Sequence, residues 1–365
     1  MKGRKVNLDY LNLYQEVPLF CALALGNFFR IQTPSTTGRV LIVNTCLIGE
    51  FAASLPAIRD YIQRHERVIV DLMVSPPLKP LAERVRGVGN VYVVRSLYGR
   101  PNERVENATH EFAAYDEIFV MRISKDAFRM LREIPAAHVR TGLREYSGYA
   151  LHLWGRLISR KPPKQWRELN FEMLGGQERA VPLDDLFDLT ESDYASLAEL
   201  EALRTTQKKI IVHTGAGWVM KKWSNDKWAV LLNRIHCLGD VRFTFVGEGG
   251  DAEDYKAISS KLEFPVYSLI GKLNLFQLLL ILRQSDYFIG TDSGPRNLAH
   301  LAGVRSLCIF GPGPHFYMPP DPRDIVVDKS RGRGLYQMFF YRKHGFINDI
   351  TADEVYEGFK KLWRS

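Results

Sequence analysis

The sequence predicts an α/β protein made of two doubly wound domains, each with a parallel sheet, that face each other across a cleft. Its 365 residues correspond to about two domains of ordinary size. A hydrophobic content of 46% and a charged content of 25% are typical of globular proteins, which excludes a largely disordered or fibrous chain. From residue 39 onwards, short β-branched runs alternate with longer amphipathic runs, a pattern that favours parallel strands connected by helices.

The first series of elements lies in a predicted domain of residues 36–185, after an N-terminal extension of residues 1–35. The run RVLIVN is continuously apolar after its arginine, as expected of a strand buried on both faces. A helix follows, because Phe51, Leu55 and Ile58 fall on one helical stripe. The expected strands are residues 39–44, 68–74, 91–94 and 117–121, and the expected helices are residues 50–65, 78–85 and 166–174.

The second series lies in a predicted domain of residues 186–350, and an acidic segment, residues 184–201, is interpreted as a linker plus a surface helix. Its expected strands are residues 210–213, 242–246, 287–289 and 306–310, and its expected helices are residues 225–237, 251–262, 275–283 and 295–301. A last helix is expected at residues 352–363, with Thr351 as its N-cap. One option for this C-terminal helix, residues 351–363, is that it packs back on the first domain.

The charge balance limits the class of partner. The formal net charge of +8 favours an anionic partner, such as a nucleotide, a phosphorylated saccharide, nucleic acid or a membrane surface. No RNA-binding or helix-turn-helix signature accompanies the basic residues, so no nucleic-acid partner is expected. The four cysteines lie far apart without a CxxC pair, which argues against a zinc site and a disulfide framework and favours a cytoplasmic location.

The longest apolar stretch is residues 17–29 (VPLFCALALGNFF), which is shorter than the roughly 20 apolar residues of a transmembrane helix. One interpretation packs it on the protein body. The other is a peripheral contact with a membrane surface, on the inner face of the cytoplasmic membrane, because Lys2, Arg4 and Lys5 lie just upstream.

The first predicted strand runs directly into a helix through NTCLIGE, residues 44–50. Gly49 lets the backbone approach a ligand closely. A carboxylate in the first turn of a helix interacts favourably with the helix dipole. Glu50 is therefore interpreted either as a functional carboxylate or as a cap of its own helix.

Two turns of the second domain are typical of anion-binding loops. The turn HTGAGW (residues 213–218) follows a strand and precedes Lys221 and Lys222, which can supply point charges to an anion. The turn GTDSGP (residues 290–295) joins a strand to a helix, so its backbone N–H groups form a helix N-terminus suited to a diphosphate. An ordinary capped turn is the alternative for GTDSGP.

Two further turns follow strands of the same domain and are expected at the same sheet edge, namely VGEGG (residues 246–250) and FGPGP (residues 310–314). Glu248 in the first of them is interpreted either as an acceptor for a ribose hydroxyl or as a solvated side chain.

In this order, the motifs IGE, GAG with KKW, GEGG, GTDSGP and FGP resemble those of the lipopolysaccharide heptosyltransferases, glycosyltransferase family 9. The resemblance covers about residues 39–315 and the C-terminal helix, and the DSGP…FGP block is its most specific part. It implies a GT-B fold with two Rossmann-like domains. It also implies an enzyme that transfers a sugar with inversion from a nucleoside diphosphate sugar, typically ADP-heptose, to a growing saccharide.

The resemblance also implies site residues. Glu50 stands where the family usually has an aspartate, the proposed general base, and Lys221 or Lys222 matches the lysine that contacts the donor phosphates. The residues matching the donor site and its diphosphate loop are Thr214, Gly215, Ala216, Gly217, Asp292, Ser293 and Gly294, with Glu248 added from its turn. No D-x-D motif occurs, so metal-independent transfer without a cofactor is expected.

The acceptor is expected to be an anionic, lipid-linked saccharide that docks on the first domain near Gly49. Residues 146–167 contain cations and tryptophans but no acid, which favours an anionic ligand. The residues singled out are Arg156, Arg160 and Lys164, with Trp154 and Trp166 as faces for sugar rings and Arg140 and Arg144 as added charge. A solvated basic face is the alternative.

Two departures from the family pattern lie at the site. Glu50 is one methylene longer than aspartate, which moves its carboxylate outward by about 1.5 Å at full extension. Asn297 stands where the family commonly has histidine, and an amide cannot carry charge. They leave two alternatives open: a binding protein of this fold with weakened or absent turnover, and a transferase that uses a different nucleotide sugar.

Overall fold

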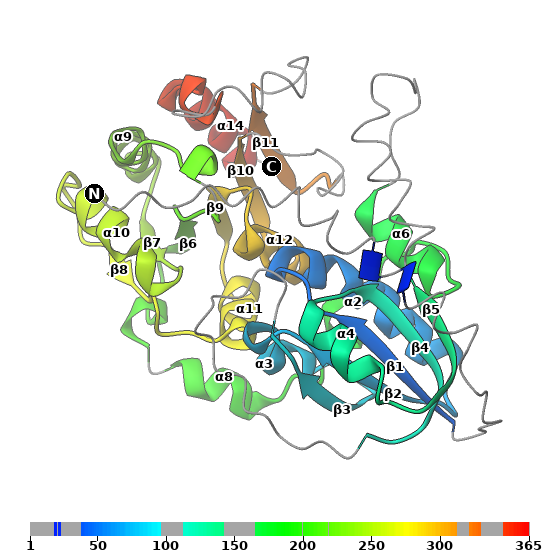
Figure 1. Ribbon diagram of the computed structural model, residues 1–365. Coiled ribbons are helices and arrows are strands. Elements are labelled where there is room, and N and C mark those ends of the chain that lie inside the picture. Colours follow the sequence, from blue (N-terminus) through cyan, green and yellow to red (C-terminus); the bar gives the residue numbers. More distant parts are fainter. Residues whose placement is uncertain are drawn as a thin grey trace. The chain divides into compact units, whose positions relative to one another are not determined.

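The computed structural model describes residues 18–19, 21–22, 38–95, 112–141, 165–198, 200–217, 219–311, 321–329 and 346–364. The chain divides into two compact units, Met1–Asp188 and Leu189–Ser365, each with its own parallel sheet (Figure 1). The predicted fold class, two doubly wound α/β domains, is confirmed.

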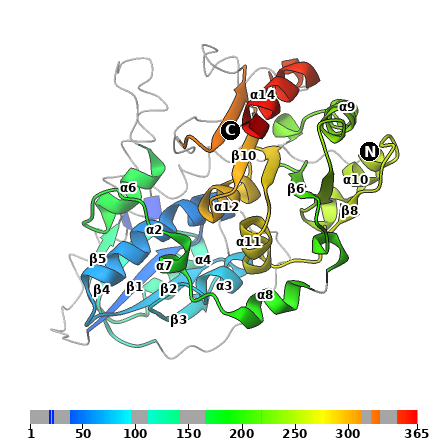
Figure 2. The ribbon, with the colours of Figure 1, turned by 180° about the vertical axis from the view of Figure 1, so that it is seen from behind.

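The sheet of the first unit has five parallel strands in the order β3-β2-β1-β4-β5. These strands are β1 (Arg39–Asn44), β2 (Ile69–Val74), β3 (Val88–Val93), β4 (Tyr115–Arg122) and β5 (Ala136–Thr141). The helices of the unit are α2 (Ile48–Arg64), α3 (Lys79–Ala82), α4 (Lys125–Leu131), α6 (Trp166–Met173) and α7 (Leu183–Leu186). Helix α2 packs against α6 and α7, and Figure 2 shows the three on one side of the sheet.

The sheet of the second unit has six parallel strands in the order β11-β10-β9-β6-β7-β8. These strands are β6 (Lys208–His213), β7 (Val241–Phe245), β8 (Tyr267–Ser268), β9 (Tyr287–Thr291), β10 (Arg305–Phe310) and β11 (Asp324–Asp328). Its helices are α8 (Glu191–Ala198), α9 (Asn225–His236), α10 (Ala252–Ser259), α11 (Leu275–Arg283), α12 (Gly294–Ala302) and α14 (Ala352–Arg364).

Both sheets reverse their strand order at one point, between β1 and β4 in the first unit and between β6 and β9 in the second. In doubly wound folds, ligands bind at this point, outside the carboxyl ends of the two strands. The relevant strand ends are Asn44 and Arg122 in the first unit and His213 and Thr291 in the second.

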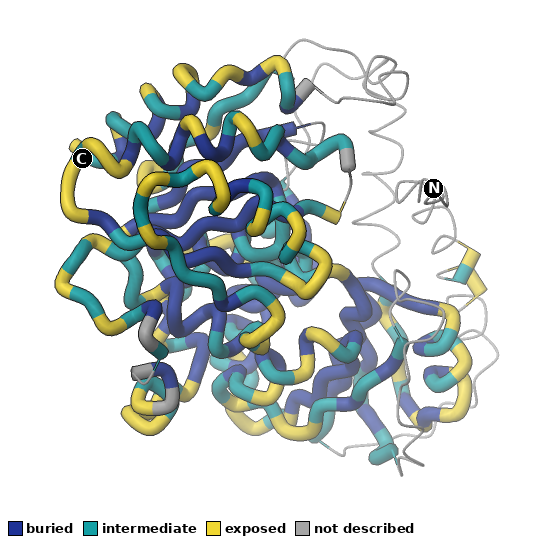
Figure 3. Tube along the Cα trace, turned by 90° about the vertical axis from the view of Figure 1, so that its left-hand side faces the viewer, coloured by how far each residue is buried: buried dark blue, intermediate teal, exposed yellow. Residues whose placement is uncertain are grey.

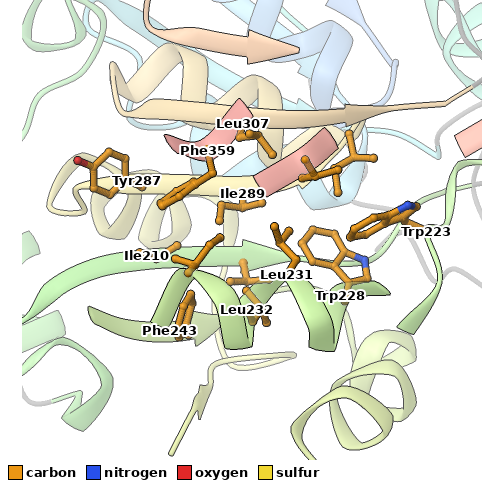
Figure 4. Packing of buried hydrophobic residues seen from close by; sticks show 14 of the residues in the cluster. Ile210, Trp223, Trp228, Leu231, Leu232, Phe243, Tyr287, Ile289, Leu307 and Phe359 are labelled. Atoms are coloured by element: carbon orange, nitrogen blue, oxygen red, sulfur yellow. The ribbon is translucent and has the colours of Figure 1, made fainter. Parts of the chain in front are cut away.

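The core of the second unit includes the C-terminal helix. Phe359 of α14 packs with Tyr287 of β9, at 5.4 Å between ring centroids, in a cluster that also contains Trp228 and Phe243 (Figure 4). Because α14 packs on α9, β10 and β11, the option that it packs back on the first domain is wrong. Its N-cap is as predicted: Thr351 and Glu354 exchange side-chain-to-backbone hydrogen bonds.

Burial follows the sheets, whose central strands are dark blue in Figure 3, while exposed residues gather on turns and outer helix faces. Of the apolar stretch at residues 17–29, Leu19 packs against the core of the first unit, and Pro18, Cys21 and Ala22 are exposed. Among the described residues, no helix is both long and apolar enough to cross a membrane.

Candidate active site

In the second unit, the carboxyl ends of β6 and β9 bring two of the predicted turns together. His213 pairs with Gly290 in the parallel register, so the turns that follow start side by side. The hydroxyl of Thr291 donates a hydrogen bond of 2.6 Å to the carbonyl of Gly215, and this bond ties the GTDSGP turn to the GAG turn. Thr214 and Asp292 are buried beside this contact, whereas Ala216 is half-buried and Gly217 exposed.

The turn after β9 leads into α12 in the way that its sequence predicts. Ser293 is the N-cap in an extended conformation, Gly294 is the first helical residue and Pro295 lies in the first turn. The Ser293 hydroxyl donates to the carbonyl of Thr291 at 3.1 Å, and it lies 3.1 Å from Nδ1 of His213. The first turn of such a helix presents N–H groups that intrahelical bonding leaves unused, together with the positive end of the dipole.

Asn297 stabilises the same turn. Its side-chain amide donates a hydrogen bond of 3.0 Å to the carbonyl of Ser293, one helical turn earlier. Further along α12, Arg296 is fully buried and its Nη2 lies 2.6 Å from Oδ2 of Asp324 in β11. The N-terminus of α12 is therefore held from its own turn and from the neighbouring strand.

The structure gives different partners to Lys221 and Lys222, which the sequence did not distinguish. Nζ of Lys221 lies 2.6 Å from Oδ2 of Asp292, directly in front of the α12 N-terminus. Nζ of Lys222 lies 2.6 Å from Oδ2 of Asp254 in α10 and 4.0 Å from Asp251. Lys221 is therefore the cation that belongs to the candidate diphosphate loop.

Asp251, which the sequence pattern did not single out, lies between two glycine turns. A Cβ on Gly215 or on Gly247 would lie 2.5 Å or 2.4 Å from its carboxylate oxygens, so a side chain at either position would displace the Asp251 carboxylate. The carboxylate accepts a hydrogen bond of 3.0 Å from the N–H of Glu248, whose own side chain is exposed. Burial raises the pKa of Asp251 above its usual range.

His213 is a further buried member of this group of polar residues. Burial, with a smaller contribution from the Lys222 charge, lowers the pKa of His213 to about 4. The ring is therefore neutral near pH 7, where one nitrogen donates and the other accepts, and it orients the hydroxyl of Ser293.

In the first unit, Glu50 lies in the first turn of α2, after Gly49 and close to the carboxyl end of β1. Its Oε1 lies 2.7 Å from Nη1 of Arg122, the last residue of β4; the Arg122 side chain is buried, and that of Glu50 is 12% exposed. Its Oε2 accepts a long hydrogen bond of 3.4 Å from the N–H of Leu47, which is the capping contact. Glu50 thus caps its helix weakly and also pairs with a buried arginine.

Arg122 is a further residue that sequence reasoning missed. Its signal in the sequence is a cation at the end of an otherwise buried strand, YDEIFVMR. Charged side chains are almost never fully buried unless they are paired. A partner at the carboxyl end of a neighbouring strand could therefore have been predicted.

Most of the predicted acceptor residues, namely Arg144, Trp154, Arg156, Arg160 and Lys164, lie outside the described residues. Trp166 was expected to offer its face to a sugar ring, and this expectation is wrong. It is 2% exposed, and the guanidinium carbon of Arg122 lies 5.5 Å from its ring centroid. Arg140 in β5 is exposed and lies 3.5 Å from Glu117.

Among the described residues, no three His, Cys, Asp or Glu side chains lie close enough together to hold a metal ion.

Comparison with known proteins identifies the family of the chain. The family described as "Glycosyltransferase family 9 (heptosyltransferase)" matches residues 130–332, more than half of the chain. Lipopolysaccharide heptosyltransferase 3 of Escherichia coli is 20% identical over 297 residues, which cover 76% of this chain and 85% of that protein.

Two solved structures share the fold. The family 9 glycosyltransferase of Veillonella parvula DSM 2008 has a TM-score of 0.68 at 17% identity, covering 90% of this chain and 98% of its own. The heptosyltransferase WaaC of E. coli, solved with ADP, has a TM-score of 0.63 at 15% identity, covering 89% of this chain and 99% of its own.

Proposed function

This chain belongs to glycosyltransferase family 9, the heptosyltransferase family, and from that premise we propose that it moves a heptose-like sugar from a nucleoside diphosphate sugar to an anionic saccharide such as a lipopolysaccharide core. The enzyme is a glycosyltransferase of the heptosyltransferase type. We propose further that the donor is ADP-linked, that transfer inverts the anomeric centre and that it needs no metal. The choice of adenine as the nucleobase of the donor is supported by the E. coli heptosyltransferase WaaC, which was solved with ADP.

The observation that carries the donor proposal is the Lys221–Asp292 pair in front of the α12 N-terminus. A lysine and a helix N-terminus both favour an anion, and here they lie at the carboxyl ends of β6 and β9, where doubly wound folds bind nucleotides. We expect the diphosphate to be lined by Thr214, Ser293 and the glycines of both turns. The exposed side chain of Glu248 would accept a hydrogen bond from a ribose hydroxyl.

The mechanism that we propose is a single displacement. Glu50 takes the proton of the acceptor hydroxyl as the oxygen forms a bond with the anomeric carbon of the donor. The bond from that carbon to the diphosphate breaks, and its electron pair leaves with the nucleoside diphosphate. Lys221 and the N–H groups at the start of α12 stabilise the charge that develops there, which is the task that a divalent metal performs in other transferases.

A donor panel tests the nucleotide site. We expect ADP to raise the melting temperature of the protein by a few degrees at saturation, because a ligand that binds only the folded state stabilises it by mass action. UDP, GDP and CDP at the same millimolar concentrations serve as comparison ligands. If none of the four nucleotides changes the melting temperature, the donor site has been placed wrongly. A shift with UDP, GDP or CDP alone supports the site with another base.

A second candidate function is favoured by the ion pair of Glu50 with Arg122, since a carboxylate engaged with a buried cation is a less accessible base. On this view the chain binds nucleotide sugars without turnover. Stabilisation by the donor without any sugar transfer or donor hydrolysis would identify it.

The acceptor is proposed to be an anionic, lipid-linked saccharide at the cytoplasmic face of a membrane. The changes Arg156→Ala, Arg160→Ala and Lys164→Ala together should raise the acceptor KM and leave donor binding intact, because they remove three charges that attract an anion. The acceptor KM should also rise with salt, since the Debye length is about 8 Å at physiological ionic strength. An unchanged acceptor KM in the triple variant would leave residues 146–167 as a solvated basic face.

A further inference from the structure

We propose that Arg122 is a positioning residue for Glu50, and that glutamate at position 50 and arginine at position 122 form a matched pair that aims one carboxylate oxygen at the acceptor. This inference rests on the proposed role of Glu50 as the base. It explains why the longer side chain is used at a position where the family usually has aspartate.

The contact itself is short and shielded from water. Oε1 of Glu50 and Nη1 of Arg122 are 2.7 Å apart, and the two side chains are 12% and 3% exposed. The opposite charges attract each other strongly at this distance, although the geometry at Nη1 is that of an ion pair and not of a hydrogen bond. Little solvent competes for it, so the pair restricts the rotamers of a side chain that would otherwise sample several.

Arg122 is itself held from two directions. Thr45 contacts its carbonyl with the backbone N–H at 3.3 Å and with the hydroxyl at 3.4 Å. Its guanidinium carbon lies 5.5 Å from the centroid of the Trp166 ring, within cation–π range, and that ring is buried. The support for Glu50 is therefore a fixed group, because it is tied both to the loop after β1 and to α6.

A register shift places Arg122 opposite the end of β1. Val43 pairs with Val120, but Asn44 pairs with Arg122, so Met121 is an extra residue in β4. Side chains alternate between the faces of a strand, and an extra residue moves the next one to the opposite face. The irregularity thus turns the side chain of Arg122, the last residue of β4, to the opposite face of the strand. Bulges next to functional sites commonly have this effect.

The lengths of the two side chains are matched. An aspartate at position 50 would retract the carboxylate by about 1.5 Å, which would stretch the 2.7 Å contact beyond ion-pair range. With glutamate, Arg122 holds Oε1, while Oε2 has the weaker 3.4 Å contact with the N–H of Leu47. Oε2 is then the oxygen that accepts the proton from the acceptor hydroxyl.

The test is a double-mutant cycle with Glu50→Asp and Arg122→Gln, measured as kcat with donor and acceptor saturating. We expect each single change to lower kcat about 10- to 100-fold, because a shift of about 1 Å in a catalytic group can cost 10²-fold. The double variant should lose little more than either single variant, since both changes break the same contact. Arg122→Lys should recover part of the kcat lost in Arg122→Gln.

The split between kcat and KM distinguishes positioning from a purely structural role. Loss of the guanidinium misplaces the base in the transition state, so Arg122→Gln should lower kcat and leave the KM for the donor near the wild-type value, and Arg122→Lys should lower kcat less. Arg129→Gln is the matched control, because it removes the same charge from an exposed pair with Asp126 in the same unit. We expect that control to leave kcat and the KM for the donor unchanged.

Three results would overturn the pairing: wild-type kcat in both single variants, losses that multiply in the double variant, or a KM for the donor that rises in Arg122→Gln as strongly as kcat falls. If Arg122→Gln does not fold, as judged by its melting transition, Glu50→Asp and Arg122→Lys decide instead: wild-type kcat in both contradicts the proposal, and a reduced kcat in both supports it. A failure of the proposed function looks different, because the wild-type protein would then transfer no sugar at all.

Discussion

Glu50→Gln is expected to lower the rate of sugar transfer by about 10²-fold or more while the dissociation constant of the donor stays close to that of the wild type. The amide keeps the size of the side chain and can still accept a hydrogen bond from the Leu47 N–H, but it cannot take a proton from the acceptor. The donor residues all belong to the second unit, so their affinity for the nucleotide should not depend on this change. Initial rates with both substrates saturating measure the effect.

Glu83→Gln is the matched control for that experiment. Glu83 is half exposed and lies 3.7 Å from Lys79 in the same unit, and a surface pair of this kind contributes little to stability. Its transfer rate should equal that of the wild type. If Glu50→Gln also transferred sugar at the wild-type rate, Glu50 would be a helix cap and another group would have to take the proton.

Lys221→Gln is expected to lower kcat by about 10²-fold, because it removes the positive charge that meets the departing diphosphate. It also leaves the buried carboxylate of Asp292 without its 2.6 Å partner, next to the incoming phosphates. Donor affinity should therefore fall as well, and calorimetric titration with ADP measures that part separately from kcat.

Lys222→Gln provides the comparison. Nζ of Lys222 pairs with Asp254 at 2.6 Å, whereas Nζ of Lys221 pairs with Asp292 in the candidate diphosphate loop. The loss of Lys222 should therefore lower kcat less than the loss of Lys221. Equal losses in the two variants, or a larger loss in Lys222→Gln, would contradict the assignment of Lys221 to the leaving group.

Two strongly apolar elements were predicted to the residue. Strand β1 (Arg39–Asn44) and helix α11 (Leu275–Arg283) have the predicted bounds, because continuous burial or a clear cap leaves few alternatives. Strands β5, β8 and β11 were missed. All three are edge strands with polar or half-buried residues, so the pairing that makes them strands depends on a neighbour that the local sequence does not reveal.

The site was predictable as a set of turns but not as a set of contacts. Glycine turns after strands, and an Asp-Ser-Gly turn before a helix, have local signatures that the sequence carries. The partners within the site are set by the sheet: Lys221 and Asp292 are 71 residues apart, and Arg122 meets Glu50 from the end of a neighbouring strand whose register shifts there. The sequence can indicate that a buried cation such as Arg122 needs a partner, but which residue the partner is depends on tertiary packing.

The transfer reaction itself tests the proposed function most directly. The protein would be incubated with ADP-heptose and a lipopolysaccharide core that lacks its outer heptose, and mass spectrometry would follow the acceptor while ADP release is measured in parallel. We expect the acceptor to gain the mass of one heptose with one ADP released for each, and both signals to fall together in Glu50→Gln. A folded protein that binds ADP yet leaves both donor and acceptor unchanged, with other nucleotide sugars as well, would contradict the claim that this chain is a working sugar transferase.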